Sequence, residues 1–150
     1  MIPVLVLHGP NLNLLGQREP DVYGQLDLAE IDRRVVTAGK QMGLEVRAFQ
    51  SNHEGILIDH LHDAQGWARG VVFNPAGYTH TSVALRDAVA AISIPVIEVH
   101  LTNTQARDSF RNNENAFWLD GKLYPLPPVR ITMPDGVDAD WVIQDLEDNL

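Results

Sequence analysis

The chain has 150 residues, of which 45% are hydrophobic and 21% are charged, and its formal net charge is −9. This length favours one domain covering residues 1–150, and the composition is ordinary for a globular protein. The negative charge argues against nucleic acid or an anionic membrane as a partner, and the lack of cysteine excludes disulfides and thiolate chemistry. No secretory signal or membrane-spanning run is visible, so we expect a cytoplasmic protein.

Apolar runs that predict buried strands alternate along the chain with amphipathic runs that predict helices. Strands are predicted at residues 2–9, 44–52, 70–75 and 95–103, and helices at 27–43, 54–68 and 81–92. The core positions expected on the first two helices are Leu28, Ile31, Val35, Met42, Ile56, Ile58, Leu61 and Trp67. Further on, the pattern predicts a short helical turn at 106–113, a fifth strand at 129–133 and a final helix at 138–150.

Strand–helix alternation with continuous apolar strands indicates a parallel sheet covered on both faces. We therefore predict a flavodoxin-like, doubly wound α/β fold, arranged as a three-layer sandwich. Ligands of such sheets bind outside the carboxyl ends of the strands. Polar loops follow all four predicted strands, at residues 8–24, 50–54, 74–81 and 100–111. The sequence thus predicts a functional site where these loops meet.

The polar residues of these loops suit acid–base chemistry on a small anion. The candidates are Asn11, Arg18, Tyr23, Asn74, His80, His100, Arg107 and Arg111. Tyrosine has a reference pKa near 10, so it acts as a base at neutral pH only where a cation stabilises the phenolate. Histidine exchanges protons near neutral pH, and arginine binds carboxylates bidentately. No metal-ligand spacing and no nucleotide-phosphate loop is visible in the sequence.

Six of these eight candidates also have a purely structural interpretation. Asn11 could make an Asx turn, Tyr23 could cover the end of the sheet, and His80 could cap the third helix. His100 could be a hydrogen-bonded core histidine, and the two arginines after the fourth strand could form a solvated helix face. The residue types alone leave both interpretations open.

Taken together, five motifs resemble the type II 3-dehydroquinate dehydratase family. They are "GPNLNLLGQREPDVYG", "FQSNHEGILID", "THTSVALRDA", "IEVHLTN" and "ARDSFR", in the family's order and spacing over roughly residues 4–111. The resemblance implies a flavodoxin-like fold and conversion of 3-dehydroquinate to 3-dehydroshikimate through an enolate. It implies no cofactor, metal or Schiff-base lysine, and a place in either the shikimate pathway of aromatic amino acid biosynthesis or quinate catabolism.

The resemblance implies a set of catalytic residues. Tyr23, on a mobile lid with Arg18, would be the base that removes a proton from C2 of the substrate. Asn11 would position a water that stabilises the enolate. His100, oriented by Glu98, would be the general acid that protonates the departing C1 hydroxyl.

The resemblance also implies a set of substrate-binding residues. Asn74, Leu101 and Thr102 would bind the substrate carboxylate, and His80 and Arg111 would hold ring hydroxyls.

Two further residues have implied roles that reach beyond one loop. Arg107 would help Arg18 to lower the pKa of the tyrosine and hold the site closed. Asp87 would reach into the site of a neighbouring subunit, as in the family's dodecamer, which is a tetramer of trimers. The implied partners are thus the small-molecule substrate and further copies of the chain.

The chain departs from the family pattern at three places. Ala76 in "NPAG" replaces a glycine, Gln105 and the asparagines of "FRNNEN" stand where the family has histidines, and residues from about 112 to 150 do not resemble the family. Three functional hypotheses stay open: a dehydratase of this family, a divergent homologue acting on another cyclic hydroxy acid, and a non-catalytic binding protein on the same fold.

Overall fold

The computed structural model describes residues 1–17, 26–101, 116–119, 122–125 and 130–132. Its main sheet has the strand order β2-β1-β3-β4-β7. The strands are β1 (Ile2–His8), β2 (Leu44–Gln50), β3 (Val71–Asn74), β4 (Val96–Glu98) and β7 (Arg130–Thr132). All pairings among β1 to β4 are parallel, which confirms the predicted α/β class.

The C-terminal part of the chain adds strands that the sequence pattern only partly predicts. β7 lies at the predicted fifth strand, but it runs antiparallel to β4. A second, two-stranded sheet consists of β5 (Ala116–Leu119) and β6 (Lys122–Pro125), which pair antiparallel and were not predicted. Between β4 and β7, the part of the chain that the structure describes beyond Leu101 is this pair of strands.

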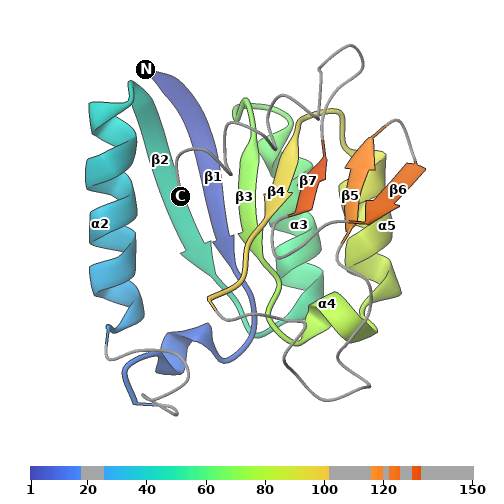
Figure 1. Ribbon diagram of the computed structural model, residues 1–150, viewed down its shortest axis with the longest axis horizontal. Coiled ribbons are helices and arrows are strands. Elements are labelled where there is room, and N and C mark those ends of the chain that lie inside the picture. The colour runs from blue at the N-terminus through green and yellow to red at the C-terminus, as the bar shows by residue number, and fades with distance from the viewer. Residues whose placement is uncertain (18–25, 102–115, 120–121, 126–129, 133–150) are drawn as a thin grey trace.

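Helices cover both faces of the sheet (Figure 1). They are η1 (Leu12–Leu14), α2 (Leu28–Gln41), α3 (Glu54–Ala64), α4 (Tyr78–Thr81) and α5 (Val83–Ala91). Within the described ranges, no helix is long and apolar enough to cross a membrane.

The alternation of side chains along β1 places two different layers against the sheet. Leu5 and Leu7 are fully buried in one core cluster with Leu57 and Leu61 of α3. His8 faces the opposite layer, where its Nε2 lies 2.7 Å from Asp32 Oδ1 of α2. This is the three-layer arrangement expected from the sequence.

Two of the predicted core positions are wrong. Met42 is 74% exposed, because α2 ends at Gln41 and the chain turns there through Gly43 with φ +78°. Ile56 is 45% exposed, since α3 turns Leu57 and Leu61 toward the sheet instead. The remaining predicted positions on these helices are buried or half-buried.

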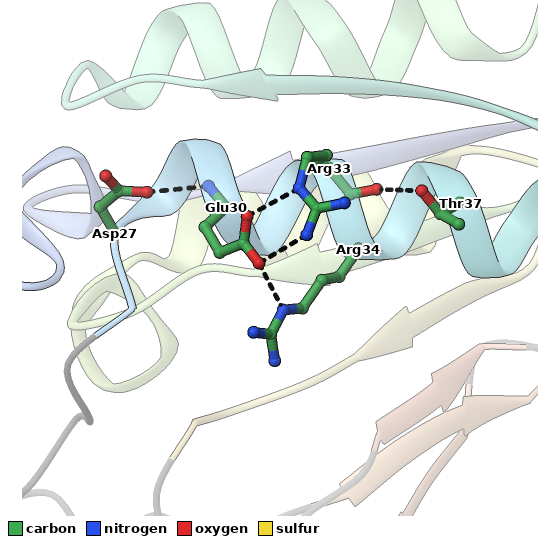
Figure 2. A network of polar contacts seen from close by, with 5 residues as sticks. All are labelled: Asp27, Glu30, Arg33, Arg34 and Thr37. Atoms are coloured by element: carbon green, nitrogen blue, oxygen red, sulfur yellow. Dashed lines mark hydrogen bonds and ion pairs between the residues drawn. The ribbon is translucent and has the colours of Figure 1, made fainter.

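The first turns of α2 carry an exposed network of polar contacts (Figure 2). The backbone N–H of Glu30 donates to Oδ1 of the capping Asp27 over 2.8 Å. The Glu30 carboxylate accepts two hydrogen bonds from Arg33 and one from Arg34, each 2.7 Å long. These contacts lower the pKa of Glu30 from 4.5 to about 2, and the hydrogen bonds from Arg33 have a larger effect than the one from Arg34.

We expect Glu30→Gln to destabilise the protein at neutral pH but not in strong acid. The pKa of Glu30 is lower in the folded state than in the unfolded state, so its contribution is fully present above pH 4.5 and is lost as the pH falls toward about 2. Urea titrations of the wild type and the variant at pH 6, 4 and 2.5 measure this difference. Asp59→Asn, on the exposed surface of α3, is the control. An equal difference between wild type and Glu30→Gln at all three pH values would contradict the prediction.

Candidate active site

The carboxyl ends of β1, β2 and β3 are joined by backbone hydrogen bonds. His8 pairs in register with Gln50 on one side and Asn74 on the other. The N–H of Gly9 donates to the Asn74 carbonyl over 2.7 Å. A Cβ at Gly9 would lie 2.6 Å from backbone atoms of Pro75, so no other residue fits this close approach. The loops after these strands are therefore held together at their base, as the sequence predicts.

Beyond β4, His100 forms a buried pair with Glu98. His100 Nε2 lies 2.7 Å from Glu98 Oε1, and the two side chains are 2% and 13% exposed. The hydroxyl of Thr79, in α4, donates a hydrogen bond of 2.8 Å to the same Oε1. β4 ends at Glu98, so His100 lies two residues past the end of the strand. The structure thus brings together the two residues to which the family resemblance assigns proton donation.

Asn74, at the end of β3, is 6% exposed. Its side-chain oxygen accepts a hydrogen bond of 3.0 Å from the N–H of Ala76, which closes an Asx turn. The turn fixes the side chain through its oxygen, so the amide NH₂ is left as a hydrogen-bond donor. A donor held in this way suits recognition of a carboxylate.

Ala76 adopts the left-handed conformation, with φ +52°. The family pattern has a glycine at this position, and the positive φ of Ala76 is a conformation that favours glycine. The next residue, Gly77, has φ −63°, which any residue adopts, and a Cβ there would meet nothing within 4 Å. The two residues of this pair are therefore in the opposite order from the one that the backbone favours.

Exchanging the two residues, Ala76→Gly with Gly77→Ala, should stabilise the protein by about 1 kcal/mol. The left-handed conformation costs a residue with a Cβ about 1–2 kcal/mol, and alanine at a helical position costs less chain entropy than glycine. Thermal and urea unfolding measure the gain, and Gly77→Ala alone should supply the smaller part of it. A loss of stability in the exchanged variant would contradict the prediction. It would show that the left-handed conformation of Ala76 does not strain the loop.

Asn11 also adopts the left-handed conformation, with φ +67°, and its side chain makes no capping hydrogen bond to η1. Its N–H donates to Asn52 Oδ1 over 2.9 Å. Asn52 also accepts from Gln50 Nε2 at 3.0 Å through Oδ1, and from the Tyr78 hydroxyl at 3.2 Å through its backbone carbonyl. Strained backbone held by surrounding contacts is typical of functional sites. Asn11 is thus positioned by its backbone, and its side chain is exposed.

The remaining described candidates lie on α4, α5 and the chain after β4. His80 is half-buried in α4 and does not cap the third predicted helix, because Ser82 does so by accepting from the Leu85 N–H over 2.9 Å. Leu101 follows His100 and is 45% exposed. Asp87 is exposed on α5. The candidates outside the described residues are Arg18, Tyr23, Thr102, Arg107 and Arg111.

Sequence reasoning missed three residues that organise this site. Thr79 was hidden within "YTHTS", which also reads as a helix start. Asn52 stands in one of the predicted polar loops but was assigned no role. His8, which is 8% exposed, was taken only as the start of a loop, and its partner Asp32 is 24 positions away. The clustering of polar residues after strands was the available signal for Asn52 and His8.

The fold and the site define a flavodoxin-like α/β domain whose polar groups gather beyond the carboxyl ends of its parallel strands. Residues 2–117 match the family model described as Dehydroquinase class II. The chain therefore belongs to the class II dehydroquinase family.

Individual relatives agree with this assignment. A 3-dehydroquinate dehydratase from Desulforudis audaxviator is 59% identical over 109 residues, which are 73% of each chain. One from Maricaulis maris is 60% identical over 74% of this chain and 76% of that protein. The crystal structure of a type II dehydroquinase from Butyrivibrio crossotus superposes with a TM-score of 0.71 and 43% identity, over 73% of this chain and 77% of that one.

Proposed function

We propose that this chain is a hydro-lyase that converts 3-dehydroquinate to 3-dehydroshikimate by anti elimination of water. The observation that carries the proposal is the buried His100–Glu98 pair at the carboxyl end of β4, in a chain that matches the class II dehydroquinase family. A histidine held against a carboxylate suits general acid catalysis, because the carboxylate orients the ring that donates the proton.

In the first step, the Tyr23 phenolate removes the proton from C2. The electrons of the C–H bond move toward the C3 ketone, whose oxygen becomes the enolate oxygen. A water positioned by Asn11 donates a hydrogen bond to that oxygen, and Arg18 and Arg107 keep the tyrosine ionised. Donors aimed at a developing oxyanion typically lower a barrier by about 3–4 kcal/mol.

In the second step, the enolate collapses and the C1–O bond breaks. His100 donates a proton to the leaving hydroxyl, so that water departs and the C1–C2 double bond forms. Glu98 accepts from Nε2 of the histidine at 2.7 Å, which supports Nδ1 as the ring nitrogen that faces the substrate. The carboxylate also stabilises the imidazolium, the form that acts as the acid.

The substrate is held by residues from the carboxyl ends of two strands, β3 and β4, and from the segments that follow them. Asn74, Leu101 and Thr102 bind its carboxylate, and His80 and Arg111 bind ring hydroxyls. The Asx turn at Asn74 supports the first of these roles, since it engages the oxygen of that side chain with the Ala76 N–H and leaves the NH₂ as the donor.

The subunit, a single domain, assembles in this proposal into trimers and from them into a dodecamer, with Asp87 of one subunit reaching the site of the next. The exposed position of Asp87 on α5 supports this role. Analytical ultracentrifugation tests the assembly, and a monomer at micromolar concentration would remove Asp87 from the site.

A direct assay tests the reaction. Purified protein is mixed with 3-dehydroquinate without added metal or nucleotide, and the absorbance of the enone product is followed in the ultraviolet. We expect turnover that is insensitive to borohydride, because no Schiff base forms. Folded protein that gives no enone would remove the proposed function.

A further inference from the structure

The threonines of the described helices use their hydroxyls in two different ways. Thr37 donates to the Arg33 carbonyl at 2.7 Å, and Thr81 donates to the Gly77 carbonyl at 3.5 Å. Both are the local bond from a helix threonine to the carbonyl four residues earlier. Thr79 lies in the same short helix as Thr81, yet its hydroxyl donates across the site to Glu98 Oε1 at 2.8 Å.

Two donors converge on that single carboxylate oxygen. A carboxylate only accepts hydrogen bonds, so the Thr79 hydroxyl and His100 Nε2 both donate to it, the second over 2.7 Å. Thr79 Oγ1 also lies 3.5 Å from His100 Nε2, which closes a triangle of three side chains. A proton on Nε2 fixes the tautomer of the neutral ring. In the imidazolium, Nδ1 is then the nitrogen that carries the proton to be donated to the substrate.

The surroundings make this contact costly to lose. Thr79 and Glu98 line one small cavity, together with Tyr78 of α4 and the charged Arg86 of α5. The side chains of Glu98 and His100 are 13% and 2% exposed. Both side chains are therefore largely shielded from solvent, and a carboxylate that loses one of its donors in such a place reorients.

We propose that Thr79 is a positioning residue for the acid step: its hydroxyl holds the Glu98 carboxylate where that group fixes the ring and tautomer of His100. The inference rests on the proposed role of His100. Thr79 lies in α4 beside His80, and α4 follows β3, whose last residue is Asn74. It therefore couples the loop that binds the substrate to the histidine that donates the proton.

Three variants test the role through steady-state kinetics. Thr79→Val keeps the shape but removes the hydroxyl, Thr79→Ser keeps the hydroxyl, and Thr81→Val is the matched control in the same helix. Thr79→Val should lower kcat by about 10–100-fold, the loss typical when an outer partner of a functional histidine is removed, and change KM less than about twofold. Thr79→Ser and Thr81→Val should stay within about threefold of the wild type. A Thr79→Ser variant as slow as Thr79→Val would overturn the proposal.

A second measurement does not need turnover. The ¹⁵N chemical shifts of the His100 ring, assigned by comparison with His100→Ala, report which nitrogen carries the proton. We expect a proton on Nε2 in the wild type and in Thr79→Ser, and a mixture of tautomers in Thr79→Val. Unchanged ring shifts in Thr79→Val would overturn the proposal even if the wild type proved inactive on 3-dehydroquinate. If Thr79→Val does not fold, Thr79→Ala takes its place in both measurements.

Discussion

Replacing His100 by alanine should lower kcat for 3-dehydroquinate by about 10²–10⁴-fold, the range that a positioned general acid supplies. The leaving group of this reaction is a hydroxide until it is protonated, and the His100–Glu98 pair at the carboxyl end of β4 is the described group that suits its protonation. Initial-rate kinetics with the purified variant measure the loss. KM should change much less, since the ring acts on the transition state.

The control for this variant is another histidine of the same chain. His60 lies on α3, where its ring stacks on Phe49 with centroids 4.5 Å apart. His60→Ala should therefore change stability but leave kcat within about twofold. Comparable rates for His100→Ala and His60→Ala would remove the general-acid assignment and leave His100 as a buried structural histidine.

The layer arrangement was predictable because it depends on patterns that are local in sequence. The apolar run at residues 2–9 gave β1 almost to the residue, and alternating Leu44, Val46 and Ala48 gave β2. The left-handed conformation at Ala76 was also indicated, because the family pattern has a glycine where this chain has Ala76. Such features are fixed by periodicity and by the backbone preference of single residues.

The contacts that shape the site were not predictable in this way, because they join residues from different elements. Neither the bond from Thr79 to Glu98 nor the pair formed by His8 and Asp32 leaves a trace in the local pattern.

The pairing of β5 with β6, in contrast, could have been predicted from the sequence. Asp120-Gly121 stands between the two strands and is a strong hairpin signal, which the sequence analysis missed.

Replacing Tyr23 by phenylalanine should abolish turnover, with kcat lowered by about 10³-fold or more, because the proposed base is the phenolate itself and phenylalanine has no group that accepts a proton. Binding of the product, measured by calorimetry, should persist. Tyr78→Phe is the control, since it removes a hydroxyl that donates to the Asn52 carbonyl at 3.2 Å, and we expect it to lower kcat less than about threefold.

Deuterium exchange separates the base from the acid. The Tyr23 step breaks the C2–H bond before His100 acts, so the two variants should stop the reaction at different points. In deuterated water, His100→Ala should still exchange the C2 proton of unreacted substrate, because the enolate forms and returns, whereas Tyr23→Phe should not. Exchange that continues in Tyr23→Phe would assign the base to another residue. Exchange lost in both variants would mean that proton removal and departure of the hydroxyl occur in one concerted step, and the enolate would have to be abandoned.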